Sequence, residues 1–264
     1  MFKICLVLLL SVNAFSMDTE GDDSGLRDDP VVVESGEGIE QEEYAGVFDR
    51  AAFWASLVYQ KTLNWWDSKS NPWWSQVDPN TLVSGIQLHG FKDWQGMKDF
   101  AEARDKKLAI LSLLRRHEVA GVFPFNPVST QEFEGMGVKR DVLPTQDWRG
   151  LDYKTIKAGL EILKQNEADG CITGINCKAG VGRSVSLAIA KAVVDEDCKG
   201  KITLSNLPNR TEDYYTYLHF CGRVRLKRKN MSLSRHQKNA LVGFIGHVAR
   251  DEDGRQWLTE FKDG

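Results

Sequence analysis

The chain lacks several patterns that would assign it to a familiar class of protein. Within its 264 residues, no apolar run approaches the roughly 20 residues that a membrane-spanning helix needs. No internal repeat is present, and neither the histidines nor the cysteines follow the spacing of a metal site. These absences leave an ordinary globular protein, and a hydrophobic fraction of 42% fits that class.

The first sixteen residues have the layout of a secretory signal peptide. Lys3 precedes an apolar run at residues 4–12, and the small residues Ala14 and Ser16 predict cleavage after Ser16. An uncleaved apolar anchor is the alternative, whereas a mitochondrial transit peptide is disfavoured because acidic residues follow at once. The sequence therefore predicts an exported protein that is secreted, periplasmic or associated with the cell envelope.

Residues 17–44 form an acidic segment that we expect to be a disordered linker. The segment holds eleven Asp or Glu and one arginine, with few large apolar side chains to offset the entropy of ordering. The whole chain carries a formal charge of −3, so residues 45–264 carry about +6 once the linker and Lys3 are set aside. A basic domain suits phosphate-bearing or anionic partners, although such charge also serves solubility.

Residues 45–264 alternate between strand-like and helix-like patterns. We expect strands at 81–88, 119–125, 137–145 and 171–176. We expect helices at 51–66, 105–117, 152–166, 183–194, 212–220 and 234–250, the last with Ser234 as its N-cap. This order predicts a single α/β domain with a central, mostly parallel sheet that helices flank on both faces.

The stretch "NCKAGVGRS" at 176–184 carries the strongest chemical signal. Its cysteine ends a predicted strand and Arg183 opens a buried helix, so successive backbone amides between them would form an anion cradle. The residues of this phosphate-binding cradle are Lys178, Ala179, Gly180, Val181, Gly182 and Arg183. The cradle and the arginine fork favour the thiolate form of Cys177, which is the form that acts as a nucleophile. Ser184 follows, where its hydroxyl can help the thiolate leave.

Other loops with glycine and a terminal cation fit less well. A Walker A loop needs a lysine after its second glycine, and none follows Gly180 or Gly182. Low-molecular-weight phosphatases carry their cysteine loop near the N-terminus, whereas this loop lies in the second half of the chain. A rhodanese loop is a formal alternative, which the long apolar helix and the acidic residue upstream disfavour.

The loop resembles the signature of the cysteine-dependent protein tyrosine phosphatase superfamily. That signature is His-Cys, five residues, Arg, then Ser or Thr, and this chain departs from it only in Asn176. The segments "WWSQVDPNTLVSGIQL", "VAGVFPFNP" and "GVKRDVLPTQDWRGLDYKTIKAGLEIL" come in the order of the dual-specificity group, and look most like its mitochondrial phosphatidylglycerophosphate phosphatase branch. The resemblance spans residues 72–245, with 89–104 as an apparent insertion and no counterpart for 1–65.

The resemblance implies a role for Asp147, thirty residues before Cys177. This aspartate would protonate the leaving oxygen and then activate water against the phosphocysteine. The residues alone leave Asp141 and Asp152 as alternatives, since turn aspartates commonly cap helices. The resemblance also implies that Arg235 and Gln237 reach the pocket. We expect no metal or other cofactor, because the loop itself neutralises the phosphoryl charge.

The substrate is open to three readings. Lys178 inside the loop favours a phospholipid head group such as phosphatidylglycerophosphate or a phosphoinositide, and the basic run at 222–230 fits either an anionic membrane or a solvated helix end. A protein tyrosine or dual-specificity phosphatase is the first alternative. A catalytically weak, phosphate-binding pseudophosphatase is the second, because Asn176 replaces the histidine that keeps the thiol acidic. No nucleic-acid partner is expected.

Four cysteines follow the predicted signal peptide. Their number is even, which in an exported protein is compatible with two disulfides. The proposed chemistry needs Cys177 as a free thiol. We therefore expect at most one bridge, formed among Cys171, Cys198 and Cys221.

Overall fold

The structure is a computed structural model that describes residues 47–70, 72–91, 93–115, 118, 126–146 and 149–263. The predicted signal peptide at 1–16, the acidic linker at 17–44, the predicted strand at 119–125 and Asp147 lie outside these ranges. By its internal contacts the chain divides into two units, Met1–Tyr59 and Gln60–Gly264. Helix α2 (Val47–Trp66) crosses this boundary and confirms the helix expected at 51–66.

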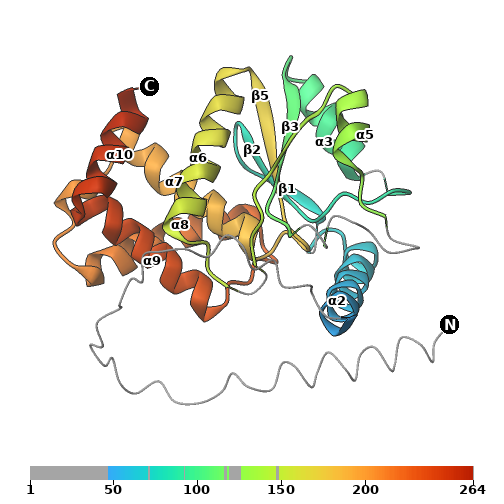
Figure 1. Cartoon of the computed structure of the whole chain (residues 1–264), viewed down its shortest axis with the longest axis horizontal. Helices are drawn as coiled ribbons and strands as arrows, with labels where there is room; N and C mark the ends of the chain where they lie inside the picture. The colour runs from blue at the N-terminus through green and yellow to red at the C-terminus, as the bar shows by residue number, and fades with distance from the viewer. Residues whose placement is uncertain are drawn as a thin grey trace. The chain divides into compact units, whose positions relative to one another are not determined.

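A five-stranded sheet forms the centre of the second unit (Figure 1). Its order is β1 (Trp74–Asp78), β2 (Thr81–Ser84), β5 (Cys171–Asn176), β3 (Lys107–Ser112) and β4 (Lys139–Val142). Strands β1 and β2 form an antiparallel hairpin, and all other pairs are parallel. The strands predicted at 81–88, 137–145 and 171–176 are therefore present, the first two shorter than expected.

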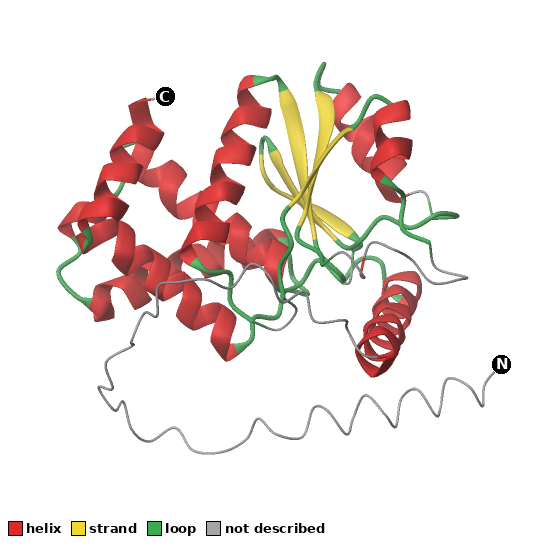
Figure 2. Ribbon diagram, viewed as in Figure 1, coloured by secondary structure: helices red, strands yellow, loops and turns green. Residues whose placement is uncertain are grey.

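Helices cover both faces of this sheet (Figure 2). The helices are α3 (Asp93–Glu102), α5 (Thr130–Gly135), α6 (Tyr153–Ala168), α7 (Arg183–Cys198), α8 (Arg210–Lys227), α9 (Arg235–Arg250) and α10 (Glu252–Asp263), with a short 3₁₀ turn at Leu204–Asn206. Helices α3 and α5 bury Met97 and Phe133 against one face, and α6 to α10 build the larger core on the other. The α/β class with a mostly parallel, two-sided sheet is confirmed. None of the helices in the described ranges is long and apolar enough to cross a membrane.

The helix predicted at 105–117 is wrong, because its apolar part is strand β3. The side chains of Leu108 and Ile110 belong to the core under α3 and α5, while those of Leu111 and Leu113 belong to the opposite core. A strand that is buried on both faces has a continuous apolar run, and such a run also fits a helical pattern. The position of β3 between β4 and β5 decides between the two, and that position depends on distant parts of the chain.

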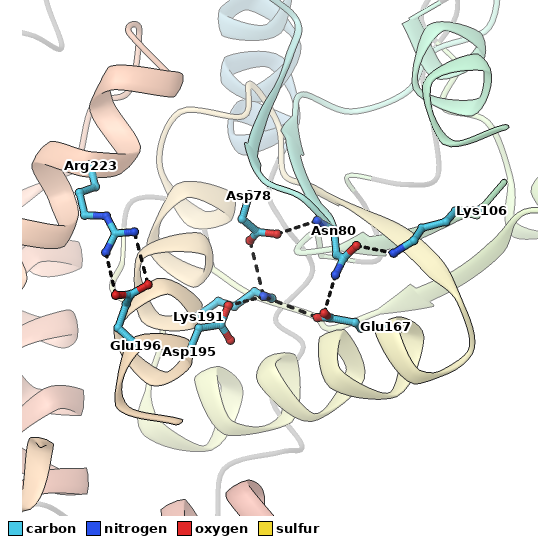
Figure 3. A network of polar contacts seen from close by, with 8 residues as sticks. All are labelled: Asp78, Asn80, Lys106, Glu167, Lys191, Asp195, Glu196 and Arg223. Atoms are coloured by element: carbon cyan, nitrogen blue, oxygen red, sulfur yellow. Dashed lines mark hydrogen bonds and ion pairs between the residues drawn. The ribbon is translucent and has the colours of Figure 1, made fainter. Parts of the chain in front are cut away.

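A polar network closes the amino edge of the parallel strands (Figure 3). The ammonium group of Lys191 lies 2.6 Å from Asp195, 3.5 Å from Asp78 and 3.8 Å from Glu167. The side chain of Asn80 donates a hydrogen bond to Glu167. Because these residues belong to the β1–β2 hairpin, the end of α6 and the middle of α7, the network ties three elements together at the edge away from the cysteine loop.

We predict that Lys191→Met lowers the free energy of unfolding by about 1–3 kcal/mol, because the partly buried Asp78 and Asp195 and the exposed Glu167 lose their shared cation. Lys201→Met is the matched control, since its side chain is 62% exposed and its partner Glu196 keeps a second ion pair with Arg223. That change should stay within about 0.5 kcal/mol. Urea unfolding of both variants measures the difference, and equal effects would contradict the assigned role of Lys191.

Candidate active site

The cysteine loop leaves the sheet at the carboxyl edge, between the ends of β2 and β3. Cys177 directly follows β5, and α7 begins at Arg183. Backbone amides from two other segments donate hydrogen bonds to carbonyls of the loop. The amide of Ile86 donates to the carbonyl of Lys178 at 3.1 Å, and the amide of Ser232 donates to that of Val181 at 2.9 Å.

Two glycines let the loop lie this close to its neighbours. Gly180 has a φ of +71°, and a Cβ there would stand 2.4 Å from the carbonyl carbon of Ser84 and 2.7 Å from the amide nitrogen of Gly85. Both the left-handed backbone and the lack of space exclude a side chain at this position. At Gly182 a Cβ would meet the amide nitrogen of the Gln237 side chain at 2.8 Å.

The predicted nucleophile and its predicted helper lie side by side. The Sγ atom of Cys177 is 3.3 Å from the Oγ atom of Ser184, so either group can act as donor. Both side chains are buried, because β5 delivers the cysteine to the inner end of the loop and Ser184 lies in the first turn of α7. The hydroxyl is therefore in place to donate to a thiolate.

Arg183 is fully buried and bound to a glutamate that the sequence analysis missed. Its Nη1 and Nη2 atoms donate to the two carboxylate oxygens of Glu118 at 2.8 and 3.1 Å, and Nη1 also donates to the carbonyl oxygen of Thr145 at 2.9 Å. This bidentate pair fixes the plane of the guanidinium. Glu118 follows β3 and Thr145 follows β4, so the arginine connects the ends of three strands. The carboxylate also offsets the positive charge that Arg183 brings to the loop.

A second buried arginine, Arg228, binds two backbone carbonyls of the loop. Its side chain is 0% exposed, although the sequence analysis treated it as part of a surface-exposed basic run. Its Nε atom donates to the carbonyl of Gly180 at 3.1 Å and Nη2 to that of Ala179 at 3.4 Å. Its Nη1 atom donates to the carbonyl of Pro72 and, at 3.2 Å, to the hydroxyl of Ser75. One guanidinium thus joins the loop to the chain that enters β1.

Arg228 also brings a buried positive charge to the loop. Burial lowers the pKa of its guanidinium to about 10, and the negative charge of the Cys177 thiolate acts in the opposite direction. A pKa of about 10 still leaves the group protonated at neutral pH. Among the described residues it contacts carbonyls and a hydroxyl but no carboxylate. Arg228 therefore supplies positive charge to the cysteine loop, whereas Arg183 shares its charge with Glu118.

Asn176 occupies the position of the superfamily's histidine without making a side-chain bond to the loop. The side chain is fully buried, and neither its Oδ1 nor its Nδ2 atom has a hydrogen-bond partner among the described residues. The strand register places it between Ser84 and Ser112, whose hydroxyls already accept bonds from Gln87 and Arg140. An unpaired buried amide is costly, and the side chain of Asn176 gives the loop no hydrogen bond among the described residues.

The predicted acid Asp147 lies outside the described residues, but its neighbours in the sequence contact the site. Thr145 accepts the bond from Arg183, and Gly150 packs so closely on the first turn of α9 that a Cβ there would stand 2.6 Å from the carbonyl oxygen of His236. The alternative Asp152 is the N-cap of α6 and accepts a 2.7 Å bond from the amide of Thr155.

The structure also places the other residues that the sequence singled out. Asp141 lies on β4, where its carboxylate is 3.8 Å from the ammonium of Lys139. Gln237 is buried against Gly182 and forms a capping box with Ser234, whereas Arg235 is exposed. Cys171, Cys177, Cys198 and Cys221 are all free thiols in this structure.

Comparison with known proteins gives likenesses at the level of the fold. No protein-family model matches the chain, and no curated protein does. The chain is similar to the solved structure of PTPMT1 in complex with PI(5)P, with 14% identity and a TM-score of 0.48 over 72% of this chain and 97% of that one. It is similar to Tk-PTP in the active form, with 17% identity and a TM-score of 0.48 over 67% and 97% of the two chains. A third likeness is the human tyrosine phosphatase-like serine/threonine/tyrosine-interacting protein, at 11% identity and a TM-score of 0.46 over 65% and 94%.

These neighbours have the cysteine-based phosphatase fold. That is the superfamily whose signature the loop resembles. Identities of 11–17% concern the fold alone, so the chemistry assigned below rests on the contacts of Cys177, Arg183 and Arg228.

We predict that Arg228→Met lowers the free energy of unfolding by about 2–4 kcal/mol, because the buried carbonyls of Ala179 and Gly180 lose their donor. Lys229→Met is the control, since the neighbouring lysine is exposed and should change stability by less than about 0.5 kcal/mol. Chemical denaturation measures both. A loss no larger than that of the control would show that Arg228 does not hold the loop.

Proposed function

We propose that the protein is a cysteine-dependent phosphoric monoester hydrolase that works through a phosphocysteine intermediate. The observation that carries the proposal is the position of the Cys177 thiol, at the inner end of a glycine loop that leads into α7, 3.3 Å from the hydroxyl of Ser184. Arg183 and Arg228 add two buried guanidinium groups that contact this loop or begin its helix. This combination suits a dianionic phosphoryl group next to a thiolate.

The reaction has two displacement steps at phosphorus. In the first, the Cys177 thiolate attacks phosphorus while the loop amides and Arg183 hold the non-bridging oxygens, and the ester P–O bond breaks as Asp147 gives its proton to the leaving oxygen. In the second, Asp147 takes a proton from water, the water oxygen bonds to phosphorus and the P–S bond breaks. The Ser184 hydroxyl donates a hydrogen bond to the thiolate that leaves.

The favoured substrate is a phospholipid head group, such as phosphatidylglycerophosphate or a phosphoinositide. Lys178 supports this choice because its charge adds to that of Arg228 at a loop already suited to one phosphate. A protein tyrosine or dual-specificity phosphatase is the alternative. The unpartnered amide of Asn176 favours a third possibility, a catalytically weak phosphate-binding protein. The proposal includes export through residues 1–16 and a catalytic domain at 45–264 behind the acidic linker.

Phosphate release separates these functions. We expect the full chain to release phosphate from short-chain phosphatidylglycerophosphate and phosphoinositides faster than from a phosphotyrosine peptide, and Cys177→Ser to abolish release from all of them. Faster release from the peptide would show that the preferred substrate is a phosphoprotein. Phosphate binding without any turnover would establish the pseudophosphatase and contradict the proposed hydrolase.

The acid is tested by comparing two aspartates of the same region. Asp147→Asn should lower kcat by about 10²–10⁴, because the leaving oxygen loses its proton donor. Asp141→Asn should have little effect, since that carboxylate faces Lys139 on β4. Steady-state kinetics across pH measures both variants. A general acid must be protonated to act, so the alkaline limb of the kcat/KM profile should disappear in Asp147→Asn. Equal losses in the two variants would reject the assignment.

A further inference from the structure

The three most exposed large apolar side chains of the described residues lie at two helix ends. Trp66 is 84% exposed and Trp65 is 83% exposed, both in the last turn of α2, and Leu226 is 77% exposed in the last turn of α8. Exposed tryptophan is costly in water and is not needed to hold this fold. The two helix ends are far apart in the sequence, so their relation depends on the fold.

Arg228 brings the two helix ends together. Its Nη1 atom donates to the carbonyl of Pro72, six residues after Trp66, and Arg228 itself follows Leu226 by two residues. Six residues span at most roughly 20 Å, so the tryptophans lie within that distance of the carbonyl that Arg228 binds at the end of α8. The last turn of α2 is fixed in turn by Lys61, whose ammonium pairs with Asp93 and lies 3.9 Å from the centre of the Trp73 ring.

This surface lies at the same edge of the sheet as the cysteine loop. Strand β1 runs antiparallel to β2, so its first residue, Trp74, pairs with Ser84 at the end of β2. Ser84 is the residue against which Gly180 of the loop packs. The chain between Trp66 and β1 therefore approaches the carboxyl edge, where Cys177 lies, and not the edge that the Lys191 network closes.

The charge of this surface comes from the end of α8. Arg225, Lys227 and Lys229 are exposed, and none of them takes part in the ion pairs of the described residues. Arg223, one turn earlier, is different because it pairs with Glu196 at 3.5 Å. Lys61 contributes no net charge, since Asp93 neutralises it.

We propose that an aromatic–basic surface docks the protein on anionic phospholipid bilayers. It consists of Trp65, Trp66, Leu226, Arg225, Lys227 and Lys229. Indole rings favour the boundary between head groups and acyl chains, and each exposed cation near the surface adds attraction to anionic lipids. The complementarity of charge selects a bilayer rather than a second copy of this basic domain.

Docking in this orientation brings the carboxyl edge toward the head groups. The consequence for turnover rests on the proposed function, because only a phosphatase that acts on lipids gains from it. The docking itself does not rest on the proposed function, since it involves none of the catalytic residues. The two can therefore fail independently.

Tryptophan quenching by brominated lipids tests the surface in the full chain. All eight tryptophans lie between residues 54 and 257, so the apolar segment at 4–12 can contribute binding but no signal. Every arm carries Cys177→Ser, which prevents turnover. We expect vesicles of brominated phosphatidylglycerol to quench the fluorescence, vesicles of brominated phosphatidylcholine to quench it far less, and Trp65→Phe/Trp66→Phe to remove most of the quenched signal.

A second variant measures the contribution of charge. Arg225→Gln/Lys227→Gln/Lys229→Gln should raise the concentration of anionic vesicles needed for half-maximal quenching on the order of 100-fold. Tyr215→Ala/Leu218→Ala is the matched control, since it removes two exposed apolar side chains from the middle of α8 and should leave the midpoint unchanged. Quenching that survives Trp65→Phe/Trp66→Phe, or that ignores lipid charge or the triple substitution, would overturn the proposal. The proposal would also be overturned if neither kind of brominated vesicle quenched the fluorescence.

Discussion

The fold around the cysteine loop depends on one buried guanidinium. Arg228 has no exposed surface, and it donates to the carbonyls of Ala179 and Gly180 in the loop and to that of Pro72 before β1. Among the residues that the structure describes, Arg228 has no carboxylate partner, and such burial is expensive, as the lowering of its pKa to about 10 shows. The arrangement is stable because carbonyl oxygens accept its hydrogen bonds. The thiolate that we propose at Cys177 would supply negative charge beside it.

Much of the molecule follows from local patterns in the sequence. The loop between β5 and α7 is predictable because Cys177, the glycines and Arg183 lie within one stretch of seven residues. The glycines allow the tight backbone, and the arginine begins the helix. The caps of α6 and α9 are predictable because Asp152 and Ser234 act on amides a few residues away. Helix α7 is also predictable from its own residues, because it is apolar around most of its surface.

The error at β3 and the omission of Glu118 and Arg228 involve partners that are distant in the sequence. β3 was mistaken for a helix because its burial on both faces is decided by β4 and β5. Glu118 gave no signal, because only the fold brings it to Arg183, 65 residues later. Arg228 was hidden among exposed lysines and arginines, and no local pattern separates the one that turns inward. One signal was available: the loop carbonyls need donors, and a run of cations near the end of α8 offers them.

The proposed chemistry requires Cys177 to be a covalent nucleophile, and trapping the phosphocysteine intermediate tests this most directly. The full chain carrying Asp147→Asn would be mixed with a phosphomonoester substrate, quenched rapidly in denaturant, digested and analysed by mass spectrometry. The account predicts one phosphoryl group on the peptide that contains Cys177, and none when Cys177→Ser is combined with Asp147→Asn. Phosphate release with no phosphorylated cysteine, or a phosphoryl group on another residue, would contradict it.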